Sequence, residues 1–283
     1  MHYDFKTANQ IKIGKLLSHV FYPLNPYRLA ACTAQHIGDR QEQQDRLALM
    51  KHDRLSGVAL AVVADGMGGR TGGGIAAEQV ITTISQLFER FQADESPFDL
   101  LSNAVKETHA IIKLLSISEE KEPHSTMVAL MTTPSKFFWV HVGDSRLYLF
   151  RNGMLKEVTS DHSFVIDAIT AGKLTVEQAA VHPNRNMLTS ALGMSSVPRY
   201  TIGDLTNPKI GDTFLLCSDG LWGHFKTEEL CHIVSTMPPK TASQLLMELA
   251  RERGRKHGDN ISMVIVKVVP KDEGPTTVMI QSA

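Results

Sequence analysis

Four aspartates in this chain stand where a short apolar run meets a glycine. They are Asp65 after AVVA, Asp144 after WVHVG, Asp219 after LLCS and Asp259 before ISMVIV. An apolar run that ends at a tight turn is typical of a buried strand, and a rigid strand end is a usual position for a functional side chain. An Asp-Gly step alone is also ordinary turn chemistry. Four such positions in one chain favour a shared site.

Carboxylates that converge on one point repel each other, so their pKa values rise unless a cation neutralises them. Ligand sets made only of oxygen suit Mg²⁺ or Mn²⁺ better than zinc. Two such ions about 3.5–4 Å apart can clamp a phosphoryl group and lower the pKa of a bridging water. The aspartates therefore indicate metal-assisted chemistry on a phosphoester.

The glycine-dense segment GMGGRTGGG at residues 66–74 allows a second interpretation. A glycine-rich loop before a helix can bind a phosphate at the helix N-terminus. However, the chain has neither the Gly-Lys-Ser/Thr step of a P-loop nor the dinucleotide-binding glycine pattern in its usual context. A nucleotide-binding protein is therefore the less favoured alternative.

The elements that must position the aspartates can be predicted from apolar periodicity and turn signals. We expect strands at residues 28–36, 57–64, 126–132, 137–142, 146–151, 155–158, 213–217 and 261–269. We expect helices at residues 75–91, 97–117, 163–171, 227–235 and 242–253, with 161–210 otherwise irregular. Clustered strands and paired helices predict an α+β domain with sheets in the middle and helix pairs outside.

Composition narrows the classes of function. With 29 basic and 30 acidic residues among 283, the net charge of -1 disfavours a nucleic-acid binder that relies on a broad basic field. Cys32, Cys217 and Cys231 form no C-x-x-C pair, so we expect buried, reduced thiols. The short apolar stretch at residues 16–24 lacks a signal-peptide cleavage site, and no segment reaches the roughly 20 apolar residues of a membrane span. We expect a cytoplasmic location.

Seven segments carry a resemblance to a known family. In order they are 40–45 (RQEQQD), 65–69 (DGMGG), 142–146 (VGDSR), 159–163 (TSDHS), 186–193 (NMLTSALG), 217–222 (CSDGLW) and 258–264 (GDNISMV). Their order and spacing resemble the type 2C, metal-dependent protein phosphatase family. The resemblance implies a central antiparallel β-sandwich flanked by pairs of α-helices, a four-layer αββα arrangement. It places the phosphatase domain at residues 28–269, between an N-terminal extension at 1–27 and a polar C-terminal tail at 270–283.

The resemblance also implies ligands for two core ions, Mn²⁺ or Mg²⁺. By this match Asp65 bridges both ions, and the carbonyl oxygen of Gly66 binds the second ion. Asp219 and Asp259 complete the protein ligands of the first ion. All of these ligands are oxygen atoms, in agreement with the chemistry expected from the aspartates alone.

Three further residues have implied roles. Asp45 matches an aspartate that orients metal-bound water, and Arg40 matches an arginine that binds the substrate phosphate, for which a planar fork is suited. Asp144, together with Asp219, matches a weaker third metal site. Residues 161–185 fall where the family has a variable flap beside the active site.

The chain departs from the family pattern at three positions. Gln44 stands where many members have a glutamate facing the second ion, so that ion is expected to bind more weakly. Met67 stands where animal members have a histidine proposed as general acid. Gly74 replaces a glutamate common in bacterial members, which we interpret as a detail of the helix start. Among the histidines, His162 is a candidate for a hydrogen bond to the substrate.

The sequence thus predicts a protein serine/threonine phosphatase that hydrolyses phosphoserine and phosphothreonine with metal-activated water. Its partners would be a phosphorylated protein substrate and an opposing serine/threonine kinase in bacterial signalling. The alternative from another class is a binding module that keeps the fold without catalysis. Loss of a core aspartate would indicate that alternative, and Asp65, Asp219 and Asp259 are all present.

Overall fold

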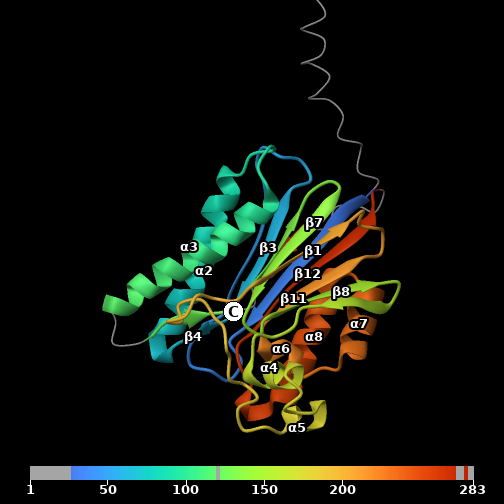
Figure 1. Ribbon diagram of the computed structural model, residues 1–283. Helices are drawn as coiled ribbons and strands as arrows, with labels where there is room; N and C mark the ends of the chain where they lie inside the picture. Colours follow the sequence, from blue (N-terminus) through green and yellow to red (C-terminus); the bar gives the residue numbers. More distant parts are fainter. Residues whose placement is uncertain (1–26, 119–121, 272–276, 280–283) are drawn as a thin grey trace, which may run out of the picture.

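Figure 1 shows the computed structural model, which describes residues 27–118, 122–271 and 277–279. Two β-sheets pack face to face in its centre, and helices cover both outer faces (Figure 1). The layers therefore follow the order helix, sheet, sheet, helix. This arrangement confirms the predicted α+β fold with a central antiparallel sandwich. The predicted N-terminal extension, apart from residue 27, lies outside the described residues.

The first sheet has six strands in the order β13-β1-β12-β11-β8-β9. Their bounds are β1 Tyr27–His36, β8 Arg146–Arg151, β9 Met154–Val158, β11 Thr213–Cys217, β12 Ile261–Pro270 and β13 Thr277–Met279. All neighbours are antiparallel except β13, which runs parallel to β1. β13 lies within the expected polar tail and is not predicted from the sequence, because three residues are too few for a periodic pattern.

The second sheet has five antiparallel strands in the order β10-β7-β6-β3-β2. Their bounds are β2 Arg46–Lys51, β3 Ala59–Ala64, β6 Met127–Thr132, β7 Lys136–Val142 and β10 Thr201–Thr206. The edge strands β2 and β10 are not predicted from the sequence, and neither has a buried position. A two-stranded ladder of β4 (Gly66–Met67) and β5 (His124–Ser125) lies beside this sheet.

The core between the sheets is built from alternate residues of the central strands. Val63 and Val128 come from one sheet, and Leu216 and Val264 come from the other, and all four are fully buried. Burial of each such side chain stabilises the fold by about 1.5–3 kcal/mol. Because the opposite faces of the same strands pack against helices, the central strands are apolar throughout, which explains why their sequences read as continuous apolar runs.

Two pairs of helices cover the sandwich. The helices α2 (Gly69–Arg90) and α3 (Pro97–Ser118) pack on the five-stranded sheet. The helices α7 (Thr227–Thr236) and α8 (Pro239–Gly254) pack on the six-stranded sheet together with the single turn α6 (Asp219–Trp222). The short helices α4 (Phe164–Thr170) and α5 (Val176–Ala180), and the 3₁₀ turn η1 (Arg255–His257), complete the set in the described residues. α4 is predicted from the sequence, whereas α5 is not.

The helix α2 begins six residues earlier than predicted, inside the glycine-dense segment. Two glycines explain this start. A Cβ at Gly73 would lie 2.5 Å from the carbonyl oxygen of Gly66, and a Cβ at Gly66 would lie 2.0 Å from the carbonyl oxygen of Gly73. These glycines therefore allow the first turns of the helix to lie directly against the β4 backbone. Gly74 lies within this helix rather than at its start, so our interpretation of that position is corrected.

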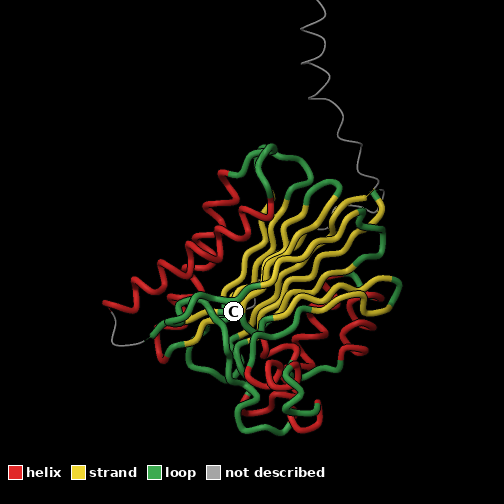
Figure 2. Tube along the Cα trace, viewed as in Figure 1, coloured by secondary structure: helices red, strands yellow, loops and turns green. Residues whose placement is uncertain are grey.

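Figure 2 shows loops gathered at one end of the sandwich, where strands of both sheets end. None of the helices in the described part of the chain combines the length and the apolar composition that a membrane crossing requires.

Candidate metal centre

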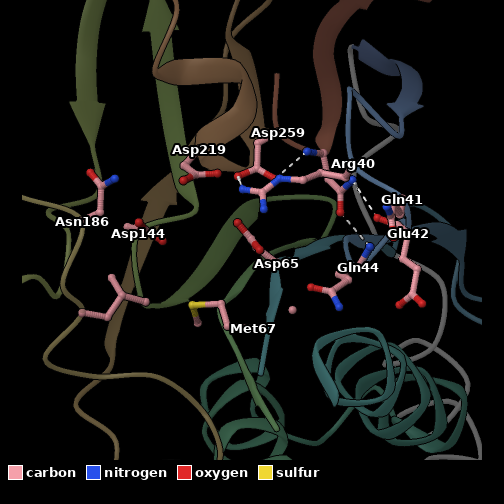
Figure 3. Close-up of a pocket in the computed structure, with 13 residues that line it drawn as sticks. Arg40, Gln41, Glu42, Gln44, Asp65, Met67, Asp144, Asn186, Asp219 and Asp259 are labelled. Carbon is pink, nitrogen blue, oxygen red and sulfur yellow. Dashed lines mark hydrogen bonds and ion pairs between the residues drawn. The ribbon is translucent and has the colours of Figure 1, made fainter. Parts of the chain in front are cut away.

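One end of the sandwich contains a cavity of about 450 Å³. Four aspartates line it from four separate loops: Asp65 after β3, Asp144 between β7 and β8, Asp219 after β11, and Asp259 before β12. Arg40 reaches toward them from the loop between β1 and β2 (Figure 3). The other lining residues are Gln41, Glu42, Gln44, Gly66, Met67, Asn186, Leu188 and Asn260. The structure thus gathers the predicted site residues around one cavity, except Asp45 and the histidine candidate His162.

Asp65 is fixed through its backbone. Its N–H donates to Thr126 Oγ1 at 2.9 Å, and its carbonyl oxygen accepts from the Thr126 N–H at 2.9 Å and from Ser125 Oγ at 3.1 Å. Since β3 before it is buried, the end of this strand cannot shift without disturbing the sheet. The side chain of Asp65 lines the cavity, where it contacts the Asp219 carboxyl group.

Asp219 and Asp259 are neighbours because β11 and β12 pair in the sheet. Asp219 is the first residue of α6, separated from the end of β11 by one residue, and Asp259 stands shortly before β12. A Cβ at Gly220 would lie 2.0 Å from the carbonyl oxygen of Asn260, so α6 packs closely on the start of β12. The glycine that follows Asp219 is therefore required by this close approach, not by a turn of positive φ.

Asp45 lies behind the cavity and is 1% exposed. The hydroxyl of Ser218 donates to its Oδ2 at 2.7 Å, and the Ser218 oxygen accepts from the Ser262 N–H at 3.0 Å. Burial raises the pKa of Asp45 to about 7, although hydrogen bonds from the Ser218 and Ser262 hydroxyl groups act to lower it. Asp45 is thus a buried carboxyl group behind the cavity, and it can hold a proton near neutral pH.

The electrostatics of the cluster are dominated by burial of like charges. Burial raises the pKa of Asp65 well above the ordinary carboxyl value, and the carboxylates of Asp45 and Asp219 raise it further. Burial also raises the pKa of Asp144 to about 7, with the Asp219 carboxylate as the next cause. Burial and the Asp259 carboxylate raise the pKa of Asp219. Such a cluster favours either protonation or a bound cation.

Arg40 supplies positive charge at the edge of the cluster. Its Nη2 donates to Asp259 Oδ2 at 2.5 Å, and this bond is the main cause that raises the pKa of the guanidinium. The Arg40 side chain is 60% exposed, so it is accessible from the solvent side of the cavity. Asp259 Oδ1 accepts from the Asn260 N–H at 2.8 Å.

The donor set fits a hard divalent cation. The cavity presents carboxylate and carbonyl oxygens, which Mg²⁺ and Mn²⁺ prefer, and its lining includes no histidine or cysteine. Within the described residues no group of three or more His, Cys, Asp or Glu side chains is already arranged to hold an ion. Asp259 Oδ2 accepts from Arg40, so an ion bound to this oxygen would share the carboxylate with the guanidinium.

Sequence reasoning missed the residue that holds the Arg40 loop. Asn260 is 5% exposed, and its Nδ2 donates to the carbonyl oxygens of Ile37 at 2.7 Å and Glu42 at 3.1 Å. Its Oδ1 accepts from the Gln44 N–H at 2.7 Å. One buried amide thus fixes the loop on both sides of Arg40. The only signal in the sequence is that Asn260 follows Asp259, which gives no hint of these partners.

His162 does not line the cavity as the described residues form it. Its Nδ1 accepts from the Gly143 N–H at 3.1 Å, and its backbone N–H donates to the Gly143 carbonyl oxygen at 2.8 Å. Its ring stacks on the buried His141 with 4.8 Å between ring centroids. These contacts make His162 part of the support for the β7–β8 turn, and its predicted bond to substrate stays a prediction.

Comparison with known proteins identifies the family. The sequence profile of the protein phosphatase 2C family matches residues 32–256. The chain belongs to the protein phosphatase 2C family. Serine/threonine protein phosphatase PstP of Mycobacterium tuberculosis is 32% identical over 234 residues, which cover 81% of this chain and 44% of PstP. Protein phosphatase PhpP of Streptococcus pneumoniae is 31% identical over 229 residues, which cover 77% of this chain and 89% of PhpP.

Solved structures agree with this membership. The serine/threonine phosphatase of S. agalactiae has a TM-score of 0.78 and 29% identity, over 85% of this chain and all of that one. The catalytic domain of PstP, solved in complex with two manganese ions, has a TM-score of 0.70 and 28% identity, over 86% of this chain and 98% of that one. The predictions of the protein phosphatase 2C family and of a phosphatase enzyme are confirmed at the level of the family.

Proposed function

We propose that this chain is a metal-dependent phosphatase that hydrolyses phosphoserine and phosphothreonine in proteins. The observation that supports it best is the group of buried carboxyl groups at one end of the sandwich, whose raised pKa values favour neutralisation by a divalent cation. The relatives PstP and PhpP are protein phosphatases, and the PstP catalytic domain has been solved with manganese ions.

We assign Asp65, Asp219 and Asp259, with the Gly66 carbonyl oxygen, to two core ions, Mn²⁺ or Mg²⁺. When bound, such ions neutralise phosphoryl oxygens and lower the pKa of water. Asp144 lies beside Asp219, and we assign this pair to a weaker third ion. Asp45 is placed behind these side chains, where its carboxyl group can hold a proton or accept one.

Arg40 is the group that would bind the substrate phosphate. Its guanidinium is a planar fork that can donate two parallel hydrogen bonds to phosphate oxygens. Since Nη2 donates to Asp259 in the structure, substrate phosphate must compete with this carboxylate for the donor. Asn186 and Leu188 line the cavity from the segment after α5, and we expect them to contact the peptide part of the substrate.

The remaining parts of the proposal concern context. We propose that residues 28–269 form the catalytic domain and that the protein acts in the cytoplasm. A protein phosphatase needs a kinase that phosphorylates its substrate, so we propose a serine/threonine kinase as the opposing activity. We expect no nucleic-acid partner, because 29 basic residues are balanced by 30 acidic residues.

Release of phosphate from a phosphothreonine peptide tests the proposal. Activity should require added Mn²⁺ or Mg²⁺ and disappear in chelator, because carboxylate sites exchange such ions readily. Asp65→Asn should abolish turnover, whereas Asp94→Asn, at an exposed position in the turn between α2 and α3, should not. Full turnover in chelator after extensive dialysis would exclude the metal mechanism. A folded wild-type protein with no activity on any phosphopeptide would favour the non-catalytic binding module.

A further inference from the structure

The turn that carries Asp144 is held from the side of α6. The Trp222 Nε1–H donates to the Asp144 carbonyl oxygen at 2.9 Å. Trp222 is the last residue of α6, and Asp219 is the first residue of the same four-residue turn. One helical turn therefore presents Asp219 to the cavity and at the same time binds the backbone of Asp144.

The Trp222 ring is itself fixed. The Arg146 guanidinium lies over it, with 3.5 Å between Arg146 Cζ and the ring centroid. Arg146 Nε and Nη2 donate to the two carboxylate oxygens of Asp161, each at 2.8 Å, and Asp161 is 8% exposed. A bidentate pair of this kind holds its partners in one geometry, and a stacked guanidinium restricts the indole ring. These contacts restrain the indole ring in the orientation that donates to the Asp144 carbonyl oxygen.

The turn is also held on its other side. The Ser145 and Thr126 hydroxyl groups are hydrogen bonded at 2.7 Å, and Thr126 Oγ1 accepts from the Asp65 N–H. Gly143, at φ +97°, exchanges hydrogen bonds with His162. These bonds fix the residues before and after Asp144 relative to Asp65 and the flap. The ladder between β8 and β11 pairs Arg146 with Cys217, and the Trp222 bond adds a direct link from the turn to α6, which begins at Asp219.

We propose that Trp222 is a positioning residue that holds the Asp144 carboxylate beside Asp219, so that the two can share a divalent cation outside the two core ions. This inference rests on the proposed function. Without the indole N–H, the Asp144 carbonyl oxygen loses this donor, and the backbone of the turn that carries the Asp144 side chain is less restrained. The carboxylates of Asp144 and Asp219 are then less often positioned so that one ion can bind both.

Mn²⁺ binding to Trp222→Phe tests the proposal, with calorimetry and the EPR signal of free Mn²⁺ as readouts. Phenylalanine keeps an aromatic ring beneath Arg146 and removes the N–H together with part of the indole ring. We expect the two tight sites to be unchanged and the weaker third site to lose affinity about 3–10-fold, as loss of one hydrogen bond predicts. Phe225→Leu is a matched control, because Phe225 stacks on Arg253 in the same region and makes no bond to Asp144.

A double-mutant cycle separates positioning from a general loss of structure. Asp144→Ala should remove the third site, and Trp222→Phe added to it should change Mn²⁺ binding no further. The proposal is overturned if Trp222→Phe leaves the third site unchanged, weakens all sites equally, or weakens binding equally with and without Asp144. A wild-type protein with two tight ions and no third contradicts this inference alone. A wild-type protein that binds no Mn²⁺ contradicts the proposed function as well.

Discussion

Replacement of Asp144 by asparagine should stabilise the metal-free protein at neutral and alkaline pH. The pKa of Asp144 in the folded protein is about 7, against an ordinary value of 3.8, because of burial and the Asp219 carboxylate. Below about pH 4 the group is protonated in both the folded and the unfolded chain. Between pH 4 and pH 7 the folded chain binds more protons than the unfolded chain, so stability falls as pH rises. Asparagine has no such proton to lose.

The size of this effect follows from the same pKa values. A rise in the carboxyl pKa from 3.8 to about 7 on folding lowers the free energy of unfolding above pH 7 by about 4 kcal/mol, at about 1.36 kcal/mol per pKa unit. Asparagine at position 144 removes this destabilisation, but its buried amide NH₂ without partners offsets about 1–2 kcal/mol of the benefit. We therefore expect Asp144→Asn to stabilise the metal-free protein by about 2–3 kcal/mol at pH 8. In a domain of this size that corresponds to a rise in Tm of about 5–10 °C.

Thermal unfolding in chelator at pH 5 and at pH 8 provides the assay. The gain in Tm for Asp144→Asn should be small at pH 5 and several degrees larger at pH 8. Asp167→Asn is a control of opposite sign, because hydrogen bonds from Arg199 lower the pKa of Asp167, which therefore stabilises the fold at high pH. Excess Mn²⁺ should stabilise the wild type more than Asp144→Asn, because ligands stabilise the state that binds them.

Two results would refute this reasoning. An Asp144→Asn protein that is less stable than the wild type at pH 8 in chelator would show that Asp144 mainly caps its turn. An equal gain at both pH values would show that its charge does not destabilise the folded state.

Three further predictions concern activity. Arg40→Ala should raise KM for a phosphopeptide more than it lowers kcat, because a phosphate contact present in both ground and transition states is lost; unchanged kinetics would exclude Arg40 from the site. Gln44→Glu should tighten the weaker of the two core ions in a metal titration, because it adds a charged oxygen at the cavity; equal affinity would contradict the expected role of Gln44. Asp144→Ala should reduce hydrolysis of phosphopeptides more than that of aryl phosphates, whose leaving groups need little protonation. Equal, small losses on both substrates would argue against a third ion at Asp144.

The acidic residues could be predicted from the sequence because each has a local signature. Asp65 directly follows a buried strand, Asp219 follows one after a single serine, and both precede glycines, so apolar pattern and turn chemistry locate them without knowledge of the fold. The layered architecture follows for the same reason, since long apolar runs report strands buried on both faces. The edge strands of the five-stranded sheet, β2 and β10, have no buried position and therefore give no comparable apolar signal.

The residues that support the site could not be predicted. Asn260 contacts a loop more than 200 positions away in the chain, and Trp222 donates to a carbonyl 78 positions away. A polar side chain whose partners are backbone atoms has no periodicity and no fixed spacing. The earlier start of α2 is a similar case, because a run of glycines predicts a loop until the close approach of Gly66 and Gly73 is known.

The pairing of β1 with β12 has a consequence for how the protein folds. Tyr27 lies opposite Pro270, so the ladder between β1 and β12 joins residues that are more than 200 positions apart in the chain. Such non-local pairing slows folding, because a long loop must close before the pair gains any stability. During synthesis β1 must wait for β12, which carries Asp259 at its start. A chain that ends before Asp259 therefore lacks both β12 and one of the four aspartates that line the cavity.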